Sequence, residues 1–173
     1  MVVPKGMPIM CFVICAGILA ACSRDSDDGL RARLDQWFFL GETVYFKSQM
    51  RCTAAMYDLT IPTPRPSLPV QSTPNQAKNA FDGGEVSALQ MPGYSPNDLT
   101  DAMLLEGRGT MGKESLAAGA QAVPCFEGSP ARTRLRDALT RPGATMVYDR
   151  GTDALIILDP EARLLFYVAG DVW

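Results

Sequence analysis

The chain of 173 residues contains no histidine. Histidine is the side chain whose ordinary pKa lies closest to neutral pH, and it is the usual general base of serine and cysteine hydrolases. Its absence excludes Ser-His-Asp and Cys-His catalysis, together with zinc and copper sites that need an imidazole ligand. Catalysis by carboxylates, lysine or tyrosine stays open.

Positive charge is also in short supply. Sixteen Lys and Arg face nineteen Asp and Glu, so the formal net charge is −3. No stretch combines a basic patch with interleaved aromatic residues, as nucleic-acid-binding proteins commonly do. The sequence therefore predicts no nucleic-acid partner. A hydrophobic content of 47% with 20% charged residues is typical of a globular protein.

Long apolar runs are rare, and the one that stands out lies near the start of the sequence. Residues 7–19 carry no charge, Lys5 precedes them, and the small residues Ala20 and Ala21 follow. The run is shorter than the ~20 residues that a membrane-spanning helix needs. A basic start, an apolar core and a small-residue exit are the pattern of an export signal.

The exit of this signal reads Leu19-Ala20-Ala21-Cys22. This tetrapeptide resembles the lipobox of bacterial lipoproteins, and the resemblance covers residues 1–22 only. It implies that Cys22 receives a diacylglyceryl group, that residues 1–21 are removed as a signal peptide, and that the new amino terminus is acylated. The alternative is an ordinary secretion signal with a cysteine at its cleavage site.

The resemblance also predicts a location. Two or three acyl chains hold a protein stably on a membrane, whereas one does not. In the lipoprotein class, a serine after the lipidated cysteine, here Ser23, implies the periplasmic face of the outer membrane; the periplasmic face of the inner membrane is the alternative. We expect residues 22–29 to form a lipidated tether and residues 30–173 a single periplasmic domain.

Cysteine usage agrees with export. Of five cysteines, Cys11 and Cys15 lie in the signal peptide and Cys22 carries the lipid, which leaves Cys52 and Cys125. Two remaining cysteines in an oxidising compartment predict one structural disulfide. A redox pair or a metal-binding pair is the alternative, and without a Cys-x-x-Cys motif each cysteine would need partners brought by the fold.

The amino-terminal part of the domain predicts a helix followed by a strand. Leu30, Leu34 and residues 37–38 share one helical face, with Ser26 as the capping residue. Residues 42–59 alternate with period two, which predicts one long strand. Prolines at 62, 64, 66, 69 and 74 predict an extended surface loop over residues 60–74, with a partner-docking segment as the alternative.

The rest of the chain predicts helices followed by a strand meander. Ser-Pro openings and glycine or proline stops favour helices over residues 95–107, 113–123 and 129–143, and Pro74 suits the start of a shorter one. Three apolar runs joined by tight turns, 144–149, 153–159 and 162–170, predict antiparallel strands. The fold class expected is α+β, an antiparallel sheet of about four strands with helices on one face.

A glycine-rich motif lies between two of the expected helices. In "EGRGTMGKES", residues 106–115, Gly107, Gly112 and Lys113 have the spacing of a nucleotide-binding phosphate loop. Glu114 stands where that loop needs a hydroxyl for Mg²⁺, and a helix is expected where a strand should precede. We therefore expect no nucleotide, no metal and no cofactor. Gly107, Gly112 and Lys113 retain a weaker interpretation as a site for a small anion.

Two functional hypotheses follow. The first is a non-catalytic envelope lipoprotein that serves as an accessory or interaction module, with the membrane and another envelope protein as its partners. The second is a cell-wall-active enzyme that uses paired carboxylates, for which no pair is marked by spacing. The absence of histidine and of any convergent catalytic set favours the first.

Overall fold

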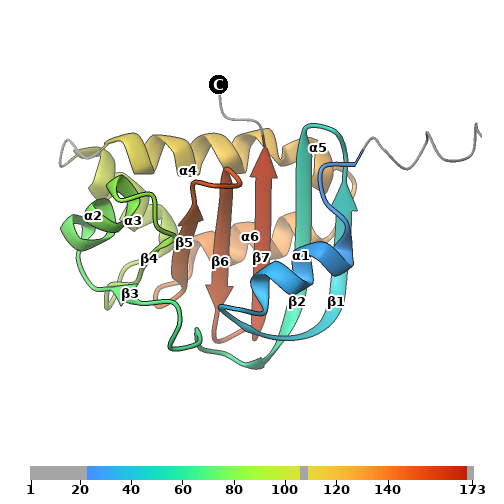
Figure 1. Ribbon diagram of the computed structural model, residues 1–173, viewed down its shortest axis with the longest axis horizontal. Coiled ribbons are helices and arrows are strands. Elements are labelled where there is room, and N and C mark those ends of the chain that lie inside the picture. The colour runs from blue at the N-terminus through green and yellow to red at the C-terminus, as the bar shows by residue number, and fades with distance from the viewer. Residues whose placement is uncertain (1–22, 106–108, 171–173) are drawn as a thin grey trace, which may run out of the picture.

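The computed structural model describes residues 23–105 and 109–170 (Figure 1). The export signal, the lipobox with Cys22, and Gly107 of the glycine-rich stretch lie outside these residues. In the described ranges no helix is both long and apolar enough to cross a bilayer.

The described residues form one seven-stranded sheet with the strand order β1-β2-β7-β6-β5-β4-β3. Neighbouring strands are antiparallel, except that β3 and β4 are parallel. The strands are β1 (Phe39–Ser48), β2 (Cys52–Ile61), β3 (Val70–Gln71), β4 (Ser87–Leu89), β5 (Thr145–Asp149), β6 (Ala154–Asp159) and β7 (Leu164–Gly170).

The prediction of about four antiparallel strands is therefore wrong, although the α+β class and the β5–β6–β7 meander are confirmed. The alternating stretch 42–59 is a hairpin rather than one strand, because the chain reverses over residues 49–51 and Ser48 pairs with Thr53. That turn contains no glycine, proline or asparagine, the usual markers of a reversal. β3 and β4 are too short to show any periodicity.

The centre of the sheet is buried on both faces. Every residue of β6 and β7 is buried, as expected of strands that read as continuous apolar runs. Leu155 and Ile157 face one hydrophobic core, whereas Ile156 and Leu158 face a second core on the opposite side. Both faces therefore have to be covered.

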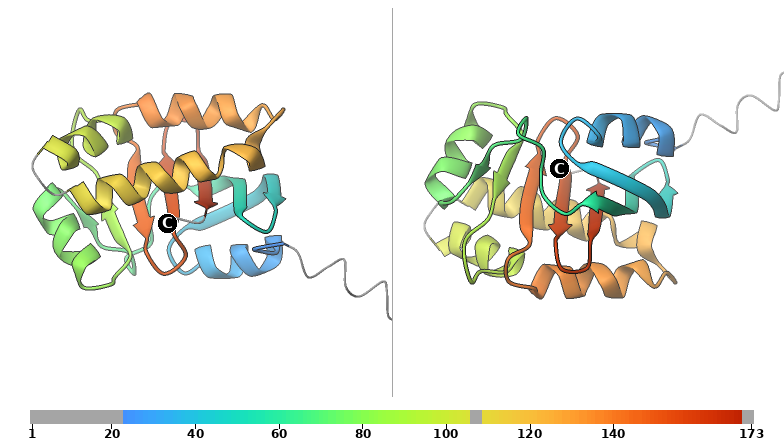
Figure 2. Two further views of the ribbon diagram at one scale, coloured as in Figure 1. Left: turned by 90° about the horizontal axis from the view of Figure 1, so that it is seen from above. Right: turned by 90° about the horizontal axis from the view of Figure 1, so that it is seen from below.

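One face of the sheet carries the helices that follow the hairpin (Figure 2). Their side chains share a core with that face, and α4 lies along β6 and β7. They are α2 (Pro74–Asp82), α3 (Pro96–Leu105), α4 (Gly109–Gln121), α5 (Val123–Phe126) and α6 (Ala131–Thr140).

The remaining helix, α1 (Asp27–Leu34), covers the other face, so the prediction of helices on one face is wrong. Leu30 and Leu34, one helical turn apart, pack with Phe38 into the second core. The i, i+4 spacing correctly predicts that this helix is amphipathic. It does not specify which side of the sheet the helix covers.

Residues 22–29 were predicted to form a tether outside the domain, but several of them already make hydrogen bonds to it. The amide of Arg24 donates to the carbonyl of Gln49 over 3.1 Å, and the Arg24 guanidinium donates to the carbonyl of Thr152 over 2.6 Å. The Asp25 carboxylate accepts a hydrogen bond from Thr53, and α1 starts at Asp27. Residues 24–29 therefore belong to the domain.

The predicted disulfide is confirmed. Cys52 and Cys125 are bonded, with an S–S distance of 2.11 Å. The bond joins the start of β2 to the short helix α5, and both cysteines are buried.

Candidate functional site

A groove opens between α4 and α6 on the helical face of the sheet, and we call it the α4–α6 groove. Its volume is about 640 Å³. Leu155 of β6 and Val168 of β7 form its floor. The other residues that line it come from α3, α4, α5 and α6: Asn97, Thr100, Ser115, Leu116, Gly119, Ala120, Val123, Phe126, Arg132, Thr133, Leu135, Arg136 and Leu139.

Small side chains on α4 keep this groove open. Gly119 and Ala120 line it, and a Cβ at Gly119 would still lie 3.8 Å from the nearest side-chain atom, Cδ2 of Leu155. Larger residues at these positions would fill the space against the floor. The far end of α4 is packed much more tightly, because a Cβ on Gly170 of β7 would lie only 2.3 Å from Cβ of Gln121.

The lining is mostly apolar, and two of its large side chains are exposed to solvent. Leu116 is 50% exposed and Val123 41% exposed. The hydroxyls among the lining residues include two that are already used: Ser115 donates to the carbonyl of Met111, and Thr100 to that of Pro96. The interior therefore offers apolar surface and makes little demand for hydrogen bonds.

Positive charge stands at one edge of the groove. Arg132 and Arg136 lie one turn apart on α6, and both side chains are exposed. Within the described part of the chain neither guanidinium has an ion-pair partner, and no lining residue carries a carboxylate. In a chain with a net charge of −3, this local excess of positive charge is unusual.

Another arginine of the same helix has a different environment. Arg134 lines a separate hollow of about 250 Å³ together with Asp137, Arg141 and Asp159. There Arg141 forms an ion pair with the buried carboxylate of Asp159. That carboxylate also accepts hydrogen bonds from the amides of residues 161 and 162. This second hollow is therefore internally neutralised, and the α4–α6 groove is not.

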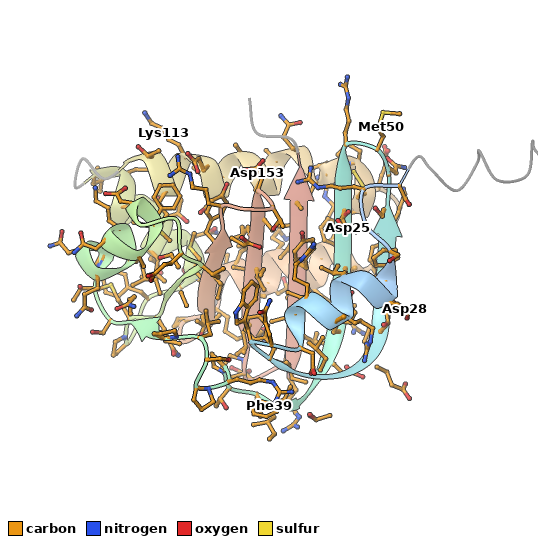
Figure 3. All side chains as sticks on the ribbon, in the orientation of Figure 1. Asp25, Asp28, Phe39, Met50, Lys113 and Asp153 are labelled. Atoms are coloured by element: carbon orange, nitrogen blue, oxygen red, sulfur yellow. A yellow bond between two sulfur atoms is a disulfide. The ribbon has the colours of Figure 1, made fainter. Side chains whose placement is uncertain are left out.

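The residues singled out in the glycine-rich stretch do not meet in one place that the structure describes. Gly112 is inside α4 and faces α3, where a Cβ would lie 3.4 Å from Cβ of Met103. Lys113 is exposed on the outer side of α4 (Figure 3). Gly107 lies outside the described residues, so the anion site formed by all three stays a prediction.

A polar cluster on the α1 side of the sheet holds that helix in place. Arg33 contacts Asp25 over 3.1 Å and donates to the hydroxyl of Tyr167 over 2.9 Å. Burial raises the pKa of Tyr167, and the nearby carboxylate of Asp25 adds to the effect. Burial likewise raises the pKa of Tyr57, whose hydroxyl donates to Asp27. These tyrosines are protonated structural residues.

Sequence reasoning missed the α4–α6 groove. The two signals available were the small residues of α4 and the recurrence of arginine at positions 132, 134 and 136 in a chain poor in positive charge. Neither signal defines a groove alone, because the floor comes from strands more than thirty residues distant from α4 in sequence.

No group of three or more metal-ligating side chains occurs among residues 23–105 and 109–170. No family model, curated protein or solved structure shows a significant match to the chain.

Proposed function

We propose that this protein is a bacterial envelope lipoprotein, anchored through Cys22, whose domain is a non-catalytic binding module that engages its ligand in the α4–α6 groove. The observation that carries the binding role is the groove itself. Its lining combines exposed apolar side chains with two arginines that lack ion-pair partners in the described part of the chain, and it includes no carboxylate. This set can hold a ligand but has no residue suited to acid–base or nucleophilic chemistry at neutral pH.

The short connection to the lipid supports a role at the membrane surface. Only Ser23 separates Cys22 from Arg24, which is already bonded to Gln49 and Thr152. One residue spans at most ~3.6 Å, so a lipid on Cys22 would hold the domain against the membrane. Met50, 69% exposed at the tip of the β1–β2 hairpin, lies next to Gln49 on that side (Figure 3).

Nothing in the described part of the chain favours the carboxylate enzyme. The two buried aspartates serve turns: Asp149 accepts hydrogen bonds from the Gly151 amide and the Thr152 hydroxyl, and Asp159 is paired with Arg141. Carboxylates engaged in this way are not available for the acid–base roles that glycan hydrolysis requires.

Metabolic labelling with radioactive palmitate tests the anchor. We expect label on the natural protein and recovery in the membrane fraction, and loss of both in Cys22→Ala. Cys15→Ala is the matched control, because it removes a cysteine from the same segment and should leave labelling intact. An unlabelled natural protein would contradict the anchor, and turnover of cell-wall fragments by the purified protein would contradict the binding role.

A further inference from the structure

We infer that the α4–α6 groove binds an anionic amphiphile with a single acyl chain, with the chain along the floor and the anionic head group against Arg132 and Arg136. The inference deepens the proposed binding role by naming the ligand class. Fatty acids and single-chain lipid phosphates share this chemistry.

The acyl-chain part rests on the lining and size of the groove. Leu155, Leu135 and Val168 are buried in the floor and walls, and Leu116 and Val123 leave half or nearly half of their surface in water. A volume of about 640 Å³ falls within the range of about 300–1,000 Å³ found for small-molecule sites. An alkyl chain would cover the exposed apolar side chains without leaving a buried polar group unsatisfied.

The head-group part rests on the two arginines. Guanidinium groups match carboxylate and phosphate geometry through paired hydrogen bonds. Arg132 and Arg136 are on the same face of α6 at the edge of the groove, whereas Arg134 faces the neutralised hollow beside Asp137 and Asp159. A neutral or cationic head group would leave this positive charge without a partner.

The position of the groove connects it with the membrane. Arg24, two residues after Cys22, is bonded to Gln49 beside the hairpin turn, and Cys52 at the other side of that turn is bonded to Cys125. The next residue, Phe126, lines the groove. The α5 end of the groove therefore lies at the same end of the molecule as the anchor, close to a supply of acyl chains.

Photo-crosslinking of the full lipidated protein, reconstituted in nanodiscs of neutral lipid, tests the inference. The probe is a myristic acid with a diazirine near its methyl end, and the labelled peptides are mapped by mass spectrometry. We expect labels on residues 116–126 or 132–139. Competition by saturated fatty acids should strengthen by about two- to fourfold per methylene, the lower value reflecting partial burial. Tetradecanol should compete at least tenfold more weakly than myristate.

Variants on α6 test whether Arg132 and Arg136 contact the head group directly or only attract anions through their charge. Arg132→Ala and Arg136→Ala together should weaken myristate competition at least tenfold, and each alone should weaken it measurably. Arg134→Ala, which removes one positive charge from the same helix as either single variant does, should leave competition within twofold. Tetradecyl phosphate competing as well as myristate would assign the site to single-chain anions in general. A preference for one of the two would name the source of the ligand.

Ala120→Trp tests the acyl-chain contact, because Ala120 is exposed on the groove wall and can be enlarged without entering the core. We expect loss of crosslinking with unchanged circular dichroism and thermal unfolding. Equal effects of the Arg134 and the Arg132/Arg136 changes, no dependence on chain length, or full labelling of a folded Ala120→Trp protein would each overturn the inference. Labelling with palmitate at Cys22 is independent of these outcomes, so the anchor and the groove can fail separately.

Discussion

Two glycines lie where α4 packs on the sheet, Gly119 on α4 itself and Gly170 on β7. They differ in the atoms that an added methyl group would contact. At Gly170 a Cβ would lie 2.3 Å from Cβ and 2.9 Å from the carbonyl carbon of Gln121, so backbone would have to move. We expect Gly170→Ala to lower the free energy of unfolding by about 1–3 kcal/mol, as overpacked sites do. Urea unfolding followed by circular dichroism measures the change.

Gly119→Ala is the matched control for that prediction. Its Cβ would meet only Cδ2 of Leu155, at an ordinary contact distance of 3.8 Å. Since alanine is the better helix former, we expect this variant to gain about 0.5–1 kcal/mol. Equal stabilities for the two variants would mean that α4 does not press against β7 at Gly170.

Hydrogen bonds at the start of α3 should make the stability of the protein depend on pH. Asp98 accepts hydrogen bonds from the hydroxyl and the amide of Ser95, and these bonds lower the pKa of the Asp98 carboxyl below its ordinary value of 3.8. A lowered folded-state pKa contributes stability above pH 3.8, and that contribution is lost as the pH falls through the folded value. Asp98→Asn should therefore be less stable than the natural protein at pH 7, and the difference should shrink below pH 3.8.

Thermal unfolding of both proteins between pH 2 and pH 7 measures this effect. Asp101→Asn is the control, because Asp101 is an exposed carboxylate on the same helix that takes no part in the Ser95–Asp98 cap. A stability difference for Asp98→Asn that stays constant down to pH 2 would refute the assignment. Capping by Ser95 and Ser26 was predictable from sequence, because a cap involves residues only a few positions apart.

At the scale of elements, the disulfide makes the strongest prediction. It closes a sequence separation of 73 residues between β2 and α5, which corresponds to about 4 kcal/mol in the chain-entropy description. We expect Cys52→Ala combined with Cys125→Ala to lose about that much of the free energy of unfolding. Reductant should lower the stability of the natural protein toward that of the double variant and leave the double variant unchanged; a reductant-insensitive natural protein would contradict the bond.

Element boundaries were predictable where a turn carries its own signal. The β5–β6 turn contains Gly151 and ends at Asp153, and the β6–β7 turn contains Pro160 and ends at Arg163; Asp153 and Arg163 both have positive φ. The meander was predicted from these two stretches. The β1–β2 reversal over residues 49–51 has no such marker, so its alternating pattern looked like one strand. Apolar and polar residues alternate with the same period of two before and after a hairpin turn, so this alternation does not by itself show where the turn lies.

At the scale of the whole molecule, the strand order and the placement of α1 depend on long-range pairing, which local sequence patterns do not reveal. β2 pairs with β7 across more than a hundred residues, and α1 covers a face that no local pattern specifies. The α4–α6 groove combines two central strands with α3, α4, α5 and α6. Each segment was recognisable by its own period, but the shape of the space between them depends on their packing.

The place of β7 in the sheet has a consequence for biogenesis. β7 is the last strand in the described chain, and it lies between β2 and β6, bonded to both. Until residues 164–170 have left the ribosome, the amino-terminal hairpin and the β5–β6 pair have no strand to join them. The emerging polypeptide therefore stays without a continuous sheet, and closure must wait for contacts of high sequence separation, which form slowly. Such a delay would suit the export that we propose, because a chain without a closed sheet stays extended for longer.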